Sequence, residues 1–190
     1  KLMKVEELSR SAPHDISNAL AAALAATHAG ADNEAIIETL RHFNHLPHRI
    51  EMIIEHQGIR WYDDSKSTTP HSVLAALESF DNVILIMGGR NKGLDLTVIM
   101  PMLNRVKHLI AIGEASKEIE LAFEKKVSVS LAESMEDAVE IAHTHSIPGD
   151  VVLLSPGCAS FDWYKNYKER GLDFAIKINS FFKGKKDDNN

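Results

Sequence analysis

The amino-acid sequence predicts an α/β fold, in which a mostly parallel, doubly wound sheet is preceded by two helices. Short apolar segments of strand length alternate with helical patterns over most of the chain. Polar or glycine-rich loops follow several of these apolar segments. Ligands of doubly wound folds bind at the loops after the carboxyl ends of the strands, so we expect the functional site there. The expected architecture is Rossmann-like.

Composition is that of an ordinary globular protein. The chain has 190 residues, of which 44% are hydrophobic and 25% charged, so it can bury a core. The formal net charge of -6 argues against a nucleic-acid-binding surface, and apolar runs such as 83–87 are too short to span a membrane. Cys158 is the only cysteine and no signal peptide is visible at 1–10. We therefore expect a cytoplasmic protein without an intrachain disulfide. We also expect a monomer.

Two short helices are expected first, within residues 1–48. Apolar residues recur every four positions in an alanine-rich run that ends at Gly30, which is typical of an amphipathic helix closed by glycine. A second helix is expected between Asp32 and His45, with one apolar face formed by Ile36, Ile37, Leu40 and Phe43. Two short helices cannot bury both faces alone, so they belong with a larger body.

Pro47 marks a boundary, because proline cannot continue a helix and the apolar pattern beyond it has a period of two residues. Residues 50–62 are expected to form a β-hairpin that turns at 56–58. This hairpin opens a second region over 49–183, and residues 184–190 are expected to form a polar tail.

Strands and helices alternate in the second region. Thr69 and Pro70 are expected to cap and begin its first helix, and Ser134 with Asp137 resembles a capping box. Later strands are expected at 83–87, 108–112, 127–130 and 150–154. Further helices are expected at 96–106, 115–123 and 134–142, and in a terminal helix that carries Phe174, Ile178 and Phe182 on one face.

The loop over 63–69, which follows a strand, is the richest in chemistry. It packs two carboxylates, an ammonium group and four hydroxyls into seven residues. One interpretation is a capped, solvated loop. The other is a site in which Asp64 accepts hydrogen bonds from ribose hydroxyls, while Lys66 and Thr68 meet phosphate or carboxylate oxygens.

Two more loops follow apolar strands. The turn over 88–93 is glycine-rich but lacks the P-loop spacing, and such turns are common structural punctuation; Lys92 at its tip is nevertheless well placed to bind an anion. The small-residue turn over 155–160 joins a buried strand to a helix and would offer backbone N–H groups to an anion. Cys158 in this turn is expected to be a packed residue rather than a nucleophile.

Ten histidines raise the question of a metal site. His42, His45 and His48 lie three residues apart, but no cysteine or carboxylate completes a tight site with them. We expect them to be spread over a helix end and a boundary loop, with no metal bound.

Three motifs stand in order along the chain. They are Asp-Ser-Lys-Ser-Thr at 64–68, Gly-Gly-Arg-Asn-Lys at 88–92, and Leu-Ser-Pro-Gly-Cys-Ala-Ser-Phe-Asp at 154–162 followed by Tyr-Lys-Asn-Tyr-Lys-Glu-Arg-Gly at 164–171. Together they resemble the Mur ligases, and among these the members that add D-glutamate. Upstream, His-Asp-Ile-Ser-Asn at 14–18 and His-Arg at 48–49 resemble two further segments of the family.

The resemblance covers nearly the whole chain and implies a division of labour. The family's nucleotide-sugar domain and its P-loop have no counterpart in this sequence. Residues 1–48 therefore look like the end of a central ATPase domain, and 49–183 like a C-terminal amino-acid-binding domain.

The family reaction is ATP-driven amide formation. ATP phosphorylates the terminal carboxylate of a UDP-muramoyl substrate, and the amine of the incoming amino acid attacks the acyl phosphate. The resemblance implies an ADP-forming ligase that joins D-glutamate to UDP-N-acetylmuramoyl-L-alanine in peptidoglycan synthesis, with ATP and Mg2+ as cofactors. This portion alone is expected to be inactive.

The family's binding residues carry over onto matching positions, and the resemblance assigns no catalytic residue in this chain. Around D-glutamate it places Thr68, Lys92, Ser160, Phe161 and Tyr167. Toward ATP it places Asn18, Arg49, Asp64 and Lys66. The chain departs from the family pattern, which has Asn, Asn, Ala and Phe, at Asp15, Asp63, Ser67 and Tyr167.

A different class of function stays open beside the ligase. A stand-alone nucleotide- or amino-acid-binding module with a regulatory role would follow if the reading frame began near Lys1 with no P-loop before it. A dehydrogenase domain is set aside, because the Gly-x-Gly-x-x-Gly fingerprint is missing.

Overall fold

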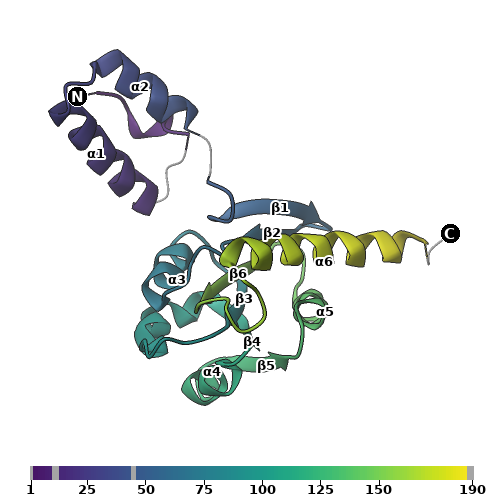
Figure 1. Ribbon diagram of the computed structural model, residues 1–190. Helices are drawn as coiled ribbons and strands as arrows, with labels where there is room; N and C mark the ends of the chain where they lie inside the picture. The colour runs from purple at the N-terminus through teal and green to yellow at the C-terminus, as the bar shows by residue number, and fades with distance from the viewer. Residues whose placement is uncertain (1, 10–12, 44–45, 188–190) are drawn as a thin grey trace. The chain divides into compact units, whose positions relative to one another are not determined.

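The computed structural model describes residues 2–9, 13–43 and 46–187. The chain divides into two compact units, Lys1–Leu46 and Pro47–Asn190 (Figure 1).

The first unit holds helices α1 (Pro13–His28) and α2 (Asn33–His42) after a 3-10 turn at Val5–Glu7. Asp32 caps α2 by accepting hydrogen bonds from two backbone N–H groups of its first turn. Several large apolar side chains of this unit are exposed, with exposed fractions of 67% and 64% for Leu20 and Leu24 on α1 and 50% for Phe43 after α2. This agrees with the expectation that two short helices cannot bury their apolar faces alone.

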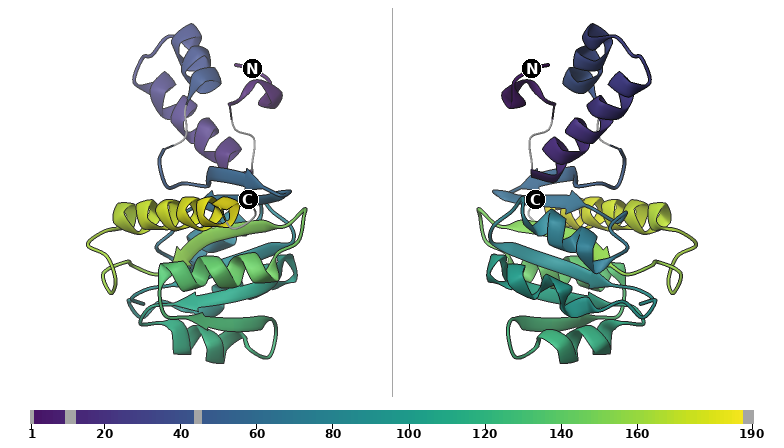
Figure 2. Two further views of the ribbon diagram at one scale, coloured as in Figure 1. Left: turned by 90° about the vertical axis from the view of Figure 1, so that its right-hand side faces the viewer. Right: turned by 90° about the vertical axis from the view of Figure 1, so that its left-hand side faces the viewer.

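The second unit is built on a six-stranded sheet in the order β1-β2-β6-β3-β4-β5. The first two strands form the expected antiparallel hairpin, and the other pairs are parallel, which confirms the predicted α/β class (Figure 2). The strands are β1 (Glu51–His56), β2 (Ile59–Asp63), β3 (Val83–Gly88), β4 (Val106–Ile112), β5 (Ser128–Ala132) and β6 (Val151–Gly157).

Helices cover both faces of this sheet. They are α3 (Pro70–Leu77), the 3-10 helix η2 (Leu96–Arg105), α4 (Ser116–Phe123), α5 (Met135–His145) and α6 (Tyr167–Asp187). Alternate residues of β3 face opposite cores: Leu85 belongs to the cluster with α3, η2 and α4, and Ile84 to the cluster with α5 and α6. Because β3 is buried on both faces, it reads as an uninterrupted apolar run in the sequence.

Two elements differ from their predicted form. The helix expected over 96–106 is a 3-10 helix, because Pro101 lies inside it and proline has no N–H for an α-helical bond. Residues 184–187, predicted as part of a polar tail, continue α6. No helix of the described residues has the length and apolar character needed to cross a membrane.

The predicted helix starts are confirmed, with one change. Thr69 accepts a hydrogen bond from the Ser72 N–H, and proline follows it as the first helical residue. Ser134 accepts from the Asp137 N–H at 3.1 Å, as in a capping box. The Asp137 carboxylate, however, accepts from the N–H of Glu133 rather than from that of Ser134.

Candidate functional site at the carboxyl edge of the sheet

Strand order brings the three chemistry-bearing loops together. Because β6 lies between β2 and β3, the loops that follow these strands are neighbours at one edge of the sheet. The Gly157 N–H donates to the Ser67 carbonyl at 2.9 Å, and Arg90 and Ala159 exchange two backbone hydrogen bonds of 2.8 and 3.1 Å. The end of β6 and the loop after it are therefore bonded to both of the other loops.

The double glycine at the end of β3 permits this close approach. Gly88 and Gly89 have φ angles of 137° and 124°, a region that side chains rarely allow. A Cβ atom on Gly88 would overlap the carbonyl of Ile112, and one on Gly89 would overlap the carbonyl of Ala159. The two glycines are therefore required for the close approach of these segments, and the turn is more than a generic chain reversal.

One buried arginine, Arg170, ties all three loops together. Its guanidinium donates to the hydroxyl and the carbonyl of Ser65, each at 2.9 Å, and to the carbonyl of Cys158 at 3.1 Å. A longer bond of 3.4 Å reaches the carbonyl of Gly88. Burial lowers the pKa of Arg170 to about 10, so the group stays charged at neutral pH.

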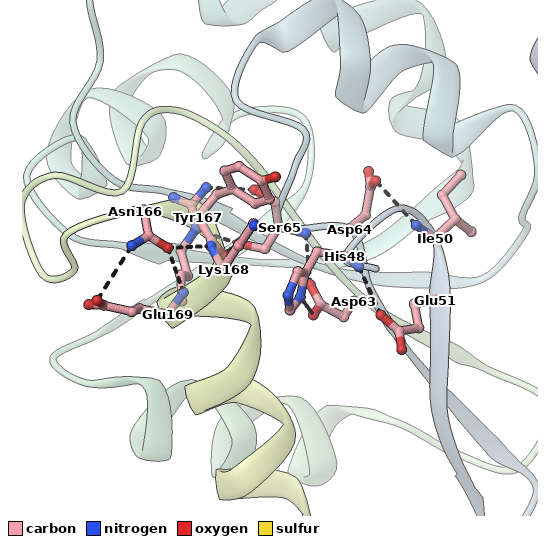
Figure 3. A network of polar contacts seen from close by, with 11 residues as sticks. His48, Ile50, Glu51, Asp63, Asp64, Ser65, Asn166, Tyr167, Lys168 and Glu169 are labelled. Carbon is pink, nitrogen blue, oxygen red and sulfur yellow. Dashed lines mark hydrogen bonds and ion pairs between the residues drawn. The ribbon is translucent and has the colours of Figure 1, made fainter. Parts of the chain in front are cut away.

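The carboxylates of Asp63, which ends β2, and of Asp64, which follows it, are buried, so this loop is not a solvated cap. Asp64 accepts from the Ile50 N–H at 3.3 Å (Figure 3). It also accepts from the Ser155 hydroxyl at 2.7 Å. Burial raises the pKa of Asp64 to about 6. The pKa of Asp63 is also raised by burial, against the opposing effect of its hydrogen bond to His48.

His48, Glu51 and Asp63 form a group whose nitrogen and oxygen atoms lie within 4.8 Å of one another, a donor set that could suit a divalent cation. Its members already bond to each other. His48 Nδ1 lies 2.7 Å from the Asp63 carboxylate, and the backbone N–H of His48 donates to the Glu51 carboxylate. Gly171 closes over the pair, since a Cβ there would overlap both His48 Nδ1 and Asp63. This group is a hydrogen-bonded anchor for the start of the unit.

Of the histidines considered for a metal, His48 lies in the second unit and His42 in the first, where it pairs with Glu38. His45 lies outside the described residues. Cys158 is buried, and burial raises the pKa of its thiol to about 12, as expected of a packed rather than a nucleophilic cysteine.

The residues predicted to surround an amino acid all belong to the second unit. They come from the three bonded loops, from the segment beyond them and from the start of α6: Thr68, Lys92, Ser160, Phe161 and Tyr167. Ser160 is buried and Phe161 is 52% exposed. Lys92 Nζ lies 5.2 Å from the centroid of the Phe161 ring.

Of the residues predicted to face a nucleotide, Arg49, Asp64 and Lys66 belong to the second unit and Asn18 to the first. Asp64 and Lys66 share one loop, and Lys66 Nζ lies 4.2 Å from the centroid of the Tyr167 ring. Arg49 is exposed just before β1. Asn18 is exposed on α1 of the first unit.

Arg170 is the member of this edge that sequence reasoning missed. It lies four residues before Phe174, in register with the apolar face of α6 that continues through Ile178. A charged residue on a buried stripe was the available signal, because such a residue needs internal partners.

A family model described as the Mur ligase glutamate ligase domain matches residues 48–158. The chain belongs to the Mur ligase family. This finding confirms the resemblance that the three loop motifs indicated.

Two Mur ligases illustrate the similarity. The UDP-N-acetylmuramoylalanine–D-glutamate ligase of Geotalea uraniireducens is 43% identical over 90% of the chain and 38% of that ligase. The ligase of the same name from Chlamydia felis is 45% identical over 83% of the chain and 38% of that ligase. The chain therefore spans well under half the length of these relatives.

A solved Mur-type structure shows the same fold. The pseudomurein peptide ligase type C from Methanothermus fervidus superposes with a TM-score of 0.71 at 19% identity. The match covers 92% of this chain and 37% of that one.

Proposed function

We propose that this chain is the C-terminal part of an ATP-dependent, ADP-forming ligase that adds D-glutamate to UDP-N-acetylmuramoyl-L-alanine. The observation that carries the proposal is the 43% identity, over 90% of the chain, to a ligase named for D-glutamate. The buried edge of three bonded loops supports it, because the motifs shared with the family lie there. In this proposal residues 49–183 form the amino-acid-binding domain and 1–48 the end of the ATPase domain.

A dicarboxylate ligand explains the chemistry of this edge. Lys92 would supply a cation to one carboxylate of D-glutamate, and Thr68 and Ser160 would donate hydroxyl hydrogen bonds. Phe161 and Tyr167 would cover the apolar carbons of the ligand. The small-residue turn after β6 adds backbone N–H groups without side chains in the way.

The proposed nucleotide side uses Asn18, Arg49, Asp64 and Lys66. Asp64 bonds to Ser155, so in this proposal it orders the loop that faces ATP. ATP and Mg2+ would supply the phosphoryl group that activates the substrate carboxylate. The printed sequence holds no P-loop, and we propose that this activation depends on parts of the ligase beyond these residues.

The proposed reaction has two steps. The substrate carboxylate takes the γ-phosphoryl group of ATP, and ADP leaves. The D-glutamate amine attacks the acyl carbon, loses a proton, and expels phosphate as the amide forms. Holding the amine in line with the acyl phosphate is the task we assign to this domain. We also propose that the ligase works in the cytoplasm as a monomer.

Amino-acid binding can be measured on this chain directly. In an NMR titration of the 15N-labelled chain, D-glutamate is expected to shift the amide signals of Lys92 and Ser160 and to bind at least about tenfold more tightly than L-glutamate. Lys92→Ala should weaken D-glutamate binding by about tenfold or more, because a charge-assisted contact is lost. Lys125→Ala, on the exposed chain after α4, is the matched control and should leave it unchanged. Preferential binding of another amino acid would reject the substrate assignment.

A further inference from the structure

Lys66 lies on an aromatic ring instead of on a carboxylate. Its Nζ is 4.2 Å from the centroid of the Tyr167 ring, within the range of a cation–π contact. Lys107, Lys117 and Lys177 are each paired with a carboxylate. Among the described residues, Lys66 has no such ion pair, although two aspartates precede it in the same loop.

Those two aspartates are occupied elsewhere. Asp63 accepts from the Ser65 N–H and from His48, and Asp64 accepts from the Ser155 hydroxyl and the Ile50 N–H. Both carboxylates are buried, whereas Lys66 is only half-buried. The two carboxylates are therefore buried, and the Lys66 ammonium group contacts the Tyr167 ring instead of a carboxylate.

Tyr167 is held firmly enough to act as a support. It is the first residue of α6. The Asn166 amide oxygen caps the first turn of this helix by accepting hydrogen bonds of 2.9 and 3.0 Å from the backbone N–H groups of Lys168 and Glu169 (Figure 3). The Tyr167 carbonyl accepts from the Ser65 hydroxyl at 2.8 Å. The His48 ring packs edge-on against the Tyr167 ring, with 6.1 Å between centroids.

We propose that Tyr167 is a positioning residue for Lys66, holding its ammonium group by a cation–π contact so that it stays fixed but unneutralised. A lysine paired with a carboxylate must break that pair to meet a phosphate, whereas a lysine on a ring face keeps its full charge for an anion. This inference rests on the proposed function, because it couples the ring assigned to the amino-acid side to the lysine assigned to the nucleotide side.

The contact is testable on the chain alone by NMR. The ε-CH2 signal of Lys66, identified by its loss in Lys66→Gln, is expected upfield of the other lysine signals because it lies over a ring. Tyr167→Phe should keep this upfield shift and Tyr167→Leu should abolish it. Phe161→Leu, which removes the ring near Lys92, is the matched control and should leave the Lys66 signal in place. A Lys66 ε-CH2 signal that is not upfield, or whose chemical shift is unchanged in Tyr167→Leu, would overturn the inference whatever the substrate is.

The functional consequence is testable in the full-length ligase that carries this chain. The KM for ATP is expected to be about fivefold higher in Tyr167→Leu than in Tyr167→Phe, since only the latter keeps a ring under Lys66. Equal KM values for ATP in the two variants would overturn the positioning role. Failure of the D-glutamate assignment would show separately, as the use of a different amino acid by the unmodified ligase.

Discussion

Arg170 and Ser65 are joined by two hydrogen bonds of 2.9 Å although they lie 105 residues apart in the chain. The same guanidinium reaches the carbonyls of Cys158 and Gly88. Carbonyl and hydroxyl dipoles thus take the place of a carboxylate around a buried cation. One side chain from α6 holds the edge of the sheet at which the motifs of the family meet.

Arg170→Lys is expected to destabilise the second unit by about 3 kcal/mol, because lysine cannot reach all these acceptors and leaves buried carbonyls unpaired. Urea unfolding followed by the fluorescence of buried Trp61 measures this loss. Arg90→Lys is the matched control, since Arg90 bonds Glu114 at the exposed surface; its effect should be much smaller. Equal effects of the two changes would argue against Arg170 as the link between loops.

Gly89→Ala should be far more harmful than Gly93→Ala. At Gly89 a Cβ overlaps the Ala159 carbonyl, so the bonded loops must separate, and we expect a loss of about 3 kcal/mol or more. Gly93 also has a positive φ, of 75°, but the described residues leave its Cβ position open. Its change to alanine should cost about 1 kcal/mol. Thermal unfolding of both variants gives the comparison, and similar losses would contradict the close approach at Gly89.

Asp64 should give the folded chain a characteristic pH dependence. Burial raises its pKa from 3.8 to about 6, so between these values the folded chain holds a proton that the unfolded chain has released. Its contribution to stability is full below pH 3.8 and is lost as the pH rises toward about 6. The shift corresponds to about 2–3 kcal/mol. Relative to Asp64→Asn, the free energy of unfolding of the unchanged chain should therefore be about this much lower at pH 7 than at pH 4. Urea unfolding at the two pH values measures the difference.

A second aspartate, Asp95, is the control for the direction of this pH dependence. Hydrogen bonds from Thr97 lower the pKa of exposed Asp95, so its contribution is present above its unfolded pKa and is lost as the pH falls. Asp95→Asn should therefore change stability with pH in the opposite direction to Asp64→Asn. If both variants changed the pH dependence of stability in the same direction, the pKa of Asp64 would not be raised by burial.

The local pattern of the sequence was enough to predict most elements. The uninterrupted apolar run of β3 and the Thr69–Pro70 start of α3 are local signals, and both are confirmed. The placement of β6 between β2 and β3 is not local, because it depends on crossovers through helices. Without that order, the loops could be recognised only by their motifs and not seen as one bonded edge.

The kinds of residue in the candidate site could be predicted from the sequence, but their burial and their contacts could not. The acidic and hydroxyl-rich loop allowed a solvated interpretation, and only the fold shows that Asp63 and Asp64 are buried. The role of Arg170 depends on contacts across more than one hundred residues, which no local pattern encodes. Asn18 lies in the other unit, and its part in a nucleotide site stays a prediction.

The central claim is tested most directly by the product of the full-length ligase that carries this chain. The ligase is supplied with ATP, Mg2+, UDP-N-acetylmuramoyl-L-alanine and equal amounts of D-glutamate and L-glutamate, and the nucleotide-sugar product is analysed by mass and chirality. We predict a D-glutamyl amide, with one ADP and one phosphate released for each amide formed. ATP hydrolysis without an amide, or an amide that contains L-glutamate, would contradict the account.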